Sequence, residues 1–396
     1  MINEQMKKLG EQPSAIRELF EYGKKRKQEL GKDNVFDFSL GNPSVPSPNI
    51  VNDTLIKLIN NVDSTLLHGY TSASGDLNVR CKIVEYLNKT YNTNLDEKLV
   101  YLTVGAAASL TISLNAILNE NEEVVVLAPF FPEYRVFVEK AGGKLKIIKP
   151  IEETFEPDLQ EFEASINPYT KAVIINSPNN PTGVVLKKDV IKKITSILIR
   201  KQLEYKHDIY LISDEPYREL IYSDVTYPFV TNYYDNSIIC YSFSKSLSLP
   251  GERIGYVLLS PKMNEVKDVY SALCGAGRSL GFVCAPALFQ YMIPSCLGYT
   301  ADLSIYKKNR DLLYENLSLY GYEVVKPDGA FYLFVKSLEK DANEFSKKAK
   351  EYELLLVPSD SFGYSGYVRI SYCVETSIIE KALPKFKELI ESYKSK

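Results

Sequence analysis

Short apolar runs recur through the middle of the chain and alternate with longer amphipathic stretches. The apolar runs are Val100–Val104, Val124–Ala128, Leu145–Ile148, Ala172–Asn176, Ile209–Ser213, Ser237–Ser242 and Ile254–Leu259. The stretches with helical periodicity between them are Ala107–Asn119, Glu133–Ala141, Leu159–Ile166 and Lys187–Tyr205. Continuous rather than alternating apolar strands, separated by helices, are typical of a largely parallel sheet covered on both faces. The pattern predicts an α/β fold with a mostly parallel seven-stranded sheet flanked by helices.

The two ends of the chain have a different pattern. Near the N-terminus we expect helices at Ser14–Leu30, Ile50–Ile59 and Gly75–Tyr91, and a short strand at Val35–Leu40. Towards the C-terminus we expect helices at Leu303–Leu319 and Ile378–Tyr393, and strands at Gly329–Val335, Leu354–Pro358 and Tyr367–Tyr372. We therefore expect a large domain over residues 48–285. A smaller α+β domain would combine residues 286–396 with residues 1–47, which carry a lid segment.

Composition narrows the class of protein. The chain has 396 residues, 45% of them hydrophobic and 24% charged, as in ordinary globular proteins. A net charge of -3 argues against a nucleic-acid partner or an anionic membrane surface. No apolar run is long enough to cross a bilayer, and the N-terminus does not resemble a signal peptide. Six cysteines without a CxxC motif indicate free thiols and a cytoplasmic location.

The two histidines, His68 and His207, are too few and too far apart in sequence for a histidine zinc site or a His-based triad. We expect no metal site.

Ligands of a parallel sheet bind beyond the carboxyl ends of its strands. The run Ser237–Ser242 ends in small hydroxyl residues and Lys245, followed by Pro250-Gly251 and Arg253. A lysine at that position would be partly desolvated, which lowers its pKa and makes it an amine nucleophile for a carbonyl. Taken alone, the same stretch is equally compatible with a surface lysine in a loop.

The other strand ends carry chemistry of different kinds. Gly105-Ala106-Ala107 opens a helix and could cradle an anion, and Phe131 could stack on a flat ring. Residues 176–183 (NSPNNPTG) form a rigid turn with asparagine amides and X-Pro bonds that are candidates for a cis peptide. Asp214 ends an apolar run, where a carboxylate is costly unless it meets a cation, and Tyr217 follows it. Each feature alone fits an ordinary turn or core residue, but together they match the functional groups of pyridoxal 5'-phosphate.

Five motifs in this order resemble those of the class I and II aminotransferases, the fold type I pyridoxal-phosphate enzymes. They are NSPNNPTG (176–183), SDEPY (213–217), SFSKSLSLPGERIGY (242–256), GAFY (329–332) and VRISY (368–372). The resemblance runs nearly end to end and is greatest to bacterial aspartate and aromatic aminotransferases. It implies an enzyme that moves an amino group from an L-amino acid to a 2-oxo acid such as 2-oxoglutarate.

The resemblance also implies roles around the cofactor. Lys245 matches the lysine that binds the cofactor's aldehyde and later moves a proton, and Asp214 matches the partner of the ring nitrogen. Asn180 and Tyr217 match the pair that hydrogen-bonds the ring's phenolic oxygen. The phosphate cradle is matched by Ser242, Ser244, Arg253 and the backbone from Gly105 to Ala107. Tyr70 matches a tyrosine that reaches the phosphate in the neighbouring subunit, which implies a homodimer with shared sites.

On the substrate side, Arg369 matches the arginine that binds the α-carboxylate, with Asn180 beside it. Gly41 matches the residue whose backbone closes over that carboxylate, and Ile16 matches the apolar plug of the lid. Two positions depart from the pattern of the family. Phe131 replaces the usual Trp or Tyr over the pyridine ring, and Arg278 falls only roughly where dicarboxylate-specific members present a partner-subunit arginine.

The motifs leave rival functions open. A β-lyase or a decarboxylase on the same fold would use Lys245, Asp214 and Arg369 as well. A non-enzymatic pyridoxal-phosphate sensor is disfavoured, because the residues before Ser14 are too few for a DNA-binding domain. A nucleotide-binding α/β enzyme is disfavoured because no GxGxxG follows the early strands. The identity of the amino donor does not follow from these residues.

Overall fold

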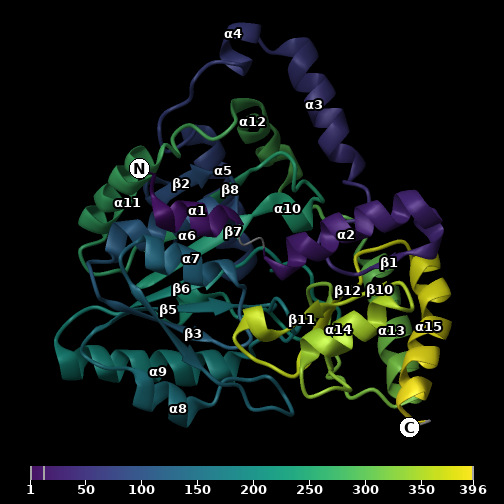
Figure 1. Cartoon of the computed structure of the whole chain (residues 1–396). Helices are drawn as coiled ribbons and strands as arrows, with labels where there is room; N and C mark the ends of the chain where they lie inside the picture. Colours follow the sequence, from purple (N-terminus) through teal and green to yellow (C-terminus); the bar gives the residue numbers. More distant parts are fainter. Residues whose placement is uncertain (1, 12–13, 395–396) are drawn as a thin grey trace.

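A computed structural model describes residues 2–11 and 14–394 (Figure 1). Met1, Gln12, Pro13, Ser395 and Lys396 lie outside the described residues, and the two ends of the predicted small domain fall among them. Within the described ranges, no helix combines the length and the apolar character needed to cross a membrane.

A seven-stranded sheet forms the centre of the molecule, in the order β2-β8-β7-β6-β5-β3-β4. β8 runs antiparallel to both its neighbours, and the other neighbouring pairs are parallel. The strands are β2 (Val100–Thr103), β3 (Glu123–Leu127), β4 (Lys144–Ile148), β5 (Thr170–Asn176), β6 (Tyr210–Asp214), β7 (Ser237–Ser242) and β8 (Gly255–Leu259). Each predicted apolar run forms one of these strands, so the prediction of a mostly parallel sheet is confirmed.

Helices cover both faces of the sheet. Along β5, Val173 and Ile175 belong to one buried cluster, whereas Ala172 and Ile174 belong to the other. The first face is covered by α5 (Leu77–Tyr91), α8 (Leu159–Ser165), α9 (Lys188–Tyr205) and α12 (Ala287–Cys296). The second face is covered by α6 (Ala106–Ile117), α7 (Glu133–Lys140) and α11 (Val266–Leu280). Burial on both sides explains why the central strands carry continuous rather than alternating apolar residues.

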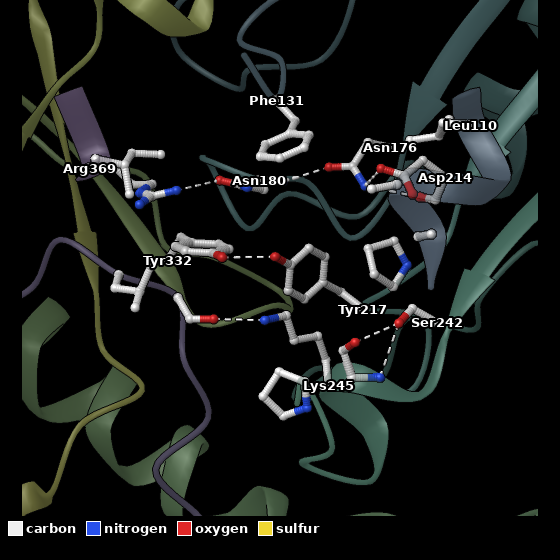
Figure 2. Close-up of a pocket in the computed structure, with 18 of the residues that line it drawn as sticks. Leu110, Phe131, Asn176, Asn180, Asp214, Tyr217, Ser242, Lys245, Tyr332 and Arg369 are labelled. Atoms are coloured by element: carbon white, nitrogen blue, oxygen red, sulfur yellow. Dashed lines mark hydrogen bonds between the residues drawn. The ribbon is translucent and has the colours of Figure 1, made fainter. Parts of the chain in front are cut away.

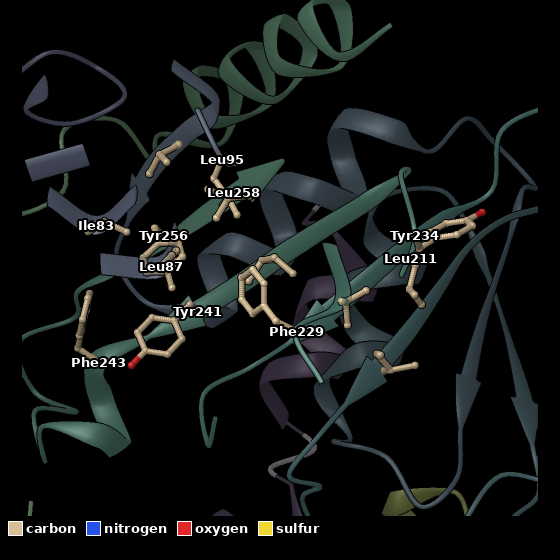
Figure 3. Close-up of a cluster of buried hydrophobic side chains, with 14 of the residues drawn as sticks. Ile83, Leu87, Leu95, Leu211, Phe229, Tyr234, Tyr241, Phe243, Tyr256 and Leu258 are labelled. Carbon is tan, nitrogen blue, oxygen red and sulfur yellow. The ribbon is translucent and has the colours of Figure 1, made fainter. Parts of the chain in front are cut away.

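Figure 3 shows the cluster on the first face, where Ile83 and Leu87 of α5 lie near Tyr256 and Leu258 of β8. Burial of each such aliphatic side chain contributes roughly 1.5–3 kcal/mol. This packing holds the strands whose ends carry the polar residues.

A third buried cluster lies around a three-stranded antiparallel sheet in the order β11-β12-β9. Its strands are β9 (Tyr332–Lys336), β11 (Val357–Pro358) and β12 (Tyr367–Ser371). A separate parallel pair joins β1 (Phe36–Asp37) to β10 (Leu354–Leu355). The helices that pack here are α13 (Leu303–Tyr320), α14 (Ala342–Lys350) and α15 (Thr376–Lys394). The predicted α+β pattern of the C-terminal part is therefore observed.

The N-terminal helix α2 (Ala15–Leu30) packs against this C-terminal part (Figure 1). Arg26 pairs with Glu353, and Lys27 pairs with Asp37 at 2.8 Å. Gly23 faces Leu355 so closely that a Cβ there would lie 2.7 Å from its side chain. A further helix, α1 (Glu4–Glu11), precedes α2 and was not expected from the sequence. The N-terminal helix α2 therefore lies against the C-terminal part of the chain, and the division into two domains stays a prediction.

The packing of α12 bears on where the large domain ends. α12 contacts α5 and α3 (Asn49–Asn61), and its residues Met292 and Ile293 belong to the cluster under the large sheet. α3 continues through α4 (Ser64–Leu67) to a loop at the top of the view in Figure 1. We propose that the large domain extends to the end of α12.

Candidate active site

A cavity of about 270 Å³ lies beyond the carboxyl ends of β5, β6 and β7, between the large sheet and the small antiparallel sheet. Figure 2 shows its side chains converging from the large sheet on one side and from β9 and β12 on the other. The residues that line it are Ile16, Leu40, Gly41, Ala106, Ala107, Leu110, Phe131, Asn176, Asn180, Asp214, Pro216, Tyr217, Ser242, Ser244, Lys245, Pro250, Arg253, Tyr332 and Arg369. Most of the residues singled out from the sequence therefore share one cavity.

Lys245 lies in a single helical turn, α10 (Phe243–Ser246), directly after β7. Its side chain is partly buried, and Nζ donates a hydrogen bond to the backbone oxygen of Gly41 at 2.7 Å. Burial lowers the pKa of Lys245 to about 8, and the nearby charges of Arg253 and Arg369 act in the same direction. The loop expected at this point is a helical turn, and the alternative of a surface lysine does not hold. An amine with this pKa is available both as a nucleophile and as a proton carrier.

Asp214 is the last residue of β6 and is 4% exposed. The hydroxyl of Tyr134 donates to its Oδ2 at 2.5 Å, and Nδ2 of Asn176 donates to its backbone oxygen at 2.9 Å. Among the residues that the structure describes, none hydrogen-bonds to Asp214 Oδ1. Burial raises the pKa of Asp214 to about 7, and the charge of Glu215 adds to the effect. A buried carboxylate of this kind favours a cationic partner.

Tyr217 follows in the turn after β6, and its hydroxyl lies 2.8 Å from the hydroxyl of Tyr332. Asn180 is held by the turn after β5, where its backbone N–H donates to Oδ1 of Asn176 at 2.7 Å. The Ser177–Pro178 bond in that turn is cis, as the sequence suggested. The amide of Asn180 and the phenol of Tyr217 thus reach the cavity from neighbouring strands, because β5 and β6 are parallel and end at the same edge.

An anion cradle lies at the start of α6. Ser242 and Ser244 place their hydroxyl oxygens 2.6 Å apart, and the N–H of Ser244 donates to Ser242 Oγ. Gly105 caps α6 with a φ of 94°, and a Cβ there would lie 2.9 Å from the guanidinium of Arg253. A helix N-terminus, two hydroxyls and an arginine together form a site suited to a phosphate.

Arg369 lies in β12 and is 1% exposed. Nη1 donates to Oδ1 of Asn180 at 3.0 Å, and Nη2 donates to the backbone oxygen of Ser39 at 2.5 Å. Within residues 2–11 and 14–394, Nε has no hydrogen-bond partner. The guanidinium rests over the ring of Tyr332, 4.6 Å from its centroid. A buried guanidinium with donors to spare is suited to a carboxylate.

Three further predicted residues line the cavity at its entrance and roof. Gly41 contacts Tyr332 so closely that a Cβ would lie 2.1 Å from its hydroxyl, which explains the need for glycine. Ile16 lines the cavity from α2, and Phe131 lines it from the segment after β3. Phe131 meets Tyr134 edge-on at a centroid distance of 5.7 Å.

The structure does not bring Tyr70 and Arg278 to this cavity. Tyr70 lies in the loop after α4 and is 98% exposed, whereas Arg278 is exposed near the end of α11. Their expected roles involve a neighbouring subunit and stay predictions. Gly105 does not line the cavity itself but supports Arg253 at its edge.

Sequence reasoning missed two tyrosines of the site. Tyr134 hydrogen-bonds Asp214 from α7, and Tyr332 hydrogen-bonds Tyr217 from β9. Tyr332 is the last residue of the GAFY motif, which was singled out in the sequence, but no role was assigned to this tyrosine. Tyr134 lies in an ordinary amphipathic helix and offers no local signal.

Comparison with known proteins finds a matching family model, similar proteins and similar solved structures. The family model described as "Aminotransferase class I and II" matches residues 33–386. A protein of Methanocaldococcus jannaschii named "Probable aspartate aminotransferase" is 32% identical over 399 residues, covering 99% of this chain and 100% of that protein. "Aromatic-amino-acid aminotransferase 2" of Thermococcus litoralis is 29% identical, covering 96% of this chain and 97% of that protein. Among solved structures, an amino transferase of Eubacterium rectale has a TM-score of 0.97 and 52% identity, with 99% of each chain covered.

Proposed function

The chain belongs to the class I and II aminotransferase family, and on that premise we propose that it uses pyridoxal 5'-phosphate held by the cavity residues described above. The observation that carries the proposal is the convergence of Lys245, Asp214 and Arg369 in one cavity. Each of these three groups is buried or partly buried, and each bears a charge or a nucleophile that no packing role requires.

The residues present fit this cofactor. Asp214 Oδ1, which accepts no hydrogen bond from any described residue, is suited to a protonated ring nitrogen. Ser242, Ser244, Arg253 and the N-terminus of α6 suit the phosphate, and Phe131 offers a ring for stacking. Asn180 and Tyr217 suit the phenolic oxygen.

Pyridoxal 5'-phosphate supplies an aldehyde that reacts with amines and a pyridine ring that withdraws electrons from the reacting carbon. Asp214 would keep the ring nitrogen protonated, because a carboxylate beside that nitrogen stabilises its positive charge. Arg369 would orient the amino acid by its α-carboxylate, with Asn180 supporting the guanidinium. Lys245 Nζ would then take up the proton of the substrate α-carbon and release it again, which its lowered pKa allows near neutral pH.

We propose aspartate or an aromatic amino acid as the donor and a 2-oxo acid such as 2-oxoglutarate as the acceptor. Relatives named for aspartate and for aromatic amino acids support both classes of donor. The test is a panel of amino donors against 2-oxoglutarate with the cofactor-loaded protein. Turnover that requires an added oxo acid supports transamination. Pyruvate and ammonia formed from amino acids without an oxo acid would instead indicate a β-lyase.

Arg278 provides a second test of donor choice. If the partner subunit presents Arg278 to the distal carboxylate of a dicarboxylic substrate, Arg278→Ala lowers kcat/KM for aspartate more than for phenylalanine. An equal effect on both donors would reject that role.

We also propose that the chain acts as a homodimer in the cytoplasm. The nearly complete exposure of Tyr70, in the loop after α4, supports a contact of that loop with a second subunit. All six cysteines are free thiols, which suits a reducing compartment.

A further inference from the structure

Tyr332 occupies a central position in the cavity, but the proposed chemistry assigns it no task. It opens β9, is 2% exposed, and points from the small antiparallel sheet towards Tyr217 (Figure 2). The two hydroxyl oxygens are 2.8 Å apart, and the two rings meet edge-on at a centroid distance of 5.6 Å.

The same side chain contacts two further groups of the site. The guanidinium of Arg369 lies 4.6 Å above the ring of Tyr332, since both residues are on one face of the β9–β12 pair. The hydroxyl of Tyr332 also lies against Gly41, whose backbone oxygen accepts the hydrogen bond from Lys245 Nζ. Tyr332 therefore touches the turn after β6, the strand β12 and the N-terminal segment at once.

We propose that Tyr332 is a positioning residue that directs the hydroxyl proton of Tyr217 towards the cofactor's phenolic oxygen and links this oxygen to the substrate-binding arginine. The inference rests on the proposed function, because it presumes that Tyr217 meets that oxygen.

The hydroxyl group of Tyr217 carries a single proton. A phenol donates one hydrogen bond, so Tyr217 can donate to the cofactor only if its contact with Tyr332 is one in which it accepts. Tyr332 then donates, and a donor that itself accepts a hydrogen bond becomes a stronger donor. Burial raises the pKa of Tyr332 to about 12 and raises that of Tyr217 as well, so both phenols keep their protons over the working pH range.

A stronger donor at Tyr217 stabilises the ionised form of the cofactor's phenolic oxygen. The pH midpoint of the absorption change of the bound cofactor should therefore be lower with Tyr332 present. The charged and titratable groups around the pair are Arg369 on β12, Cys373 after it, Asp214 at the end of β6, and Lys245, whose Nζ donates to Gly41. Substitution of a tyrosine by phenylalanine changes none of these four side chains.

The test compares Tyr332→Phe with Tyr322→Phe in the cofactor-loaded protein without substrate. Tyr322 is a matched control, because its buried hydroxyl donates to the backbone of Phe386 at 2.8 Å in the core of the small antiparallel part. We expect the absorbance midpoint to rise by roughly 0.4–1.1 pH units in Tyr332→Phe, the effect of one hydrogen bond. The midpoint of the control should equal that of the unmodified protein.

A double variant separates positioning from packing. When Tyr217→Phe has removed the receiving hydroxyl, adding Tyr332→Phe should cause no further rise, whereas two independent packing defects would add. Should Tyr332→Phe fold poorly, Gly41→Ala provides a second route, since its Cβ displaces the same hydroxyl and should raise the midpoint too.

Failure of this inference can be told apart from failure of the proposed function. An unmodified protein that binds the cofactor and titrates, together with an unchanged midpoint in folded Tyr332→Phe, overturns this inference alone. An additive rise in the double variant also overturns it. An unmodified protein that binds no pyridoxal phosphate overturns the proposed function and this inference with it.

Discussion

At the scale of single residues, burial gives the site its chemistry. Asp214 and Arg369 are nearly inaccessible, and each leaves a polar atom without a hydrogen-bond partner among the described residues. Such atoms cost folding free energy that the protein recovers only when a ligand of the right charge binds. The site is therefore expected to be less stable empty than occupied.

Asp214→Asn should stabilise the cofactor-free protein at neutral pH and weaken cofactor binding. The pKa of Asp214 rises to about 7 in the folded state, from an ordinary value of 3.8. Between these two values the folded chain binds a proton that the unfolded chain has released, so the free energy of unfolding falls as pH rises through this window. The full loss is roughly 4 kcal/mol for a shift of this size.

Asparagine cannot ionise, so the stability advantage of Asp214→Asn should grow from about pH 5 to about pH 8. Urea unfolding of both cofactor-free proteins across that range measures it. Parallel profiles of unfolding free energy against pH for the two proteins would contradict a raised pKa at Asp214. A cofactor titration of both proteins checks the expected loss of affinity.

The rate at which pyridoxal phosphate attaches to the empty protein should depend on the ionisation of Lys245. Only the unprotonated amine attacks an aldehyde, so the rate should rise about tenfold per pH unit below the pKa and level off above it. With the pKa of Lys245 lowered to about 8, the bend should occur near pH 8. Stopped-flow absorbance measures the rate, and a rise that continues to about pH 10 would indicate an ordinary exposed lysine.

The sequence identified most residues of the site because they stand next to strand ends within short motifs. Lys245, Asp214 and Asn180 each lie within four residues of the end of an apolar run, and parallel strands bring such positions together. Tyr134 and Tyr332 could not be assigned in this way. The hydrogen-bond partners of Tyr134 and Tyr332 lie 80 and 115 residues away in the sequence. No local sequence pattern around either tyrosine indicates such a partner.

At the scale of elements, the central sheet was predictable and several helices were not. Strands buried on both faces contain short continuous apolar runs, and such runs recur between amphipathic stretches along this chain. α11 escaped prediction because its sequence, VKDVYSALCGAGRSL, contains two glycines and few charges on its polar side. α10 has a single turn and lies below the length at which periodicity can be detected.

Gly255→Ala should destabilise the protein at the start of β8. A Cβ at this position would lie 2.2 Å from the backbone oxygen of Tyr241 and 3.0 Å from Cα of Gly105, and neither atom can move without shifting a strand or the cap of α6. We expect a loss of about 1–3 kcal/mol in unfolding free energy and weaker cofactor binding.

Gly251→Ala is the matched control, because a Cβ there would meet no atom of the described residues within 4 Å. Urea unfolding compares the stability of the two variants, and cofactor titration compares their affinity for the cofactor. Equal stability of the two variants would show that the β8 backbone adjusts more freely than its contacts indicate.

At the scale of the whole molecule, the cavity lies where two cores meet. The large sheet contributes Lys245 and Asp214, whereas the small antiparallel sheet contributes Arg369 and Tyr332. The α/β pattern of the first part and the α+β pattern of the second were both evident in the sequence, whereas the proposed assignment of α12 to the first part rests on its packing.

Shared sites in a dimer predict complementation. If Tyr70 of one subunit serves the site that contains Lys245 of the other, then Tyr70→Ala and Lys245→Ala subunits should restore activity when mixed. Random reassociation makes half of the dimers mixed, and each mixed dimer has one intact site, so roughly a quarter of the sites should be active. Activity of the mixture that equals the average of the two parent variants would reject sharing through Tyr70.

The most direct test of the central claim is covalent trapping of the cofactor. The protein is loaded with pyridoxal 5'-phosphate, treated with borohydride to fix the bond between amine and aldehyde, digested, and analysed by mass spectrometry. We expect one modified residue, Lys245, and no trapped cofactor in Lys245→Ala. Modification at another lysine, or none under conditions where the protein binds the cofactor, would contradict it.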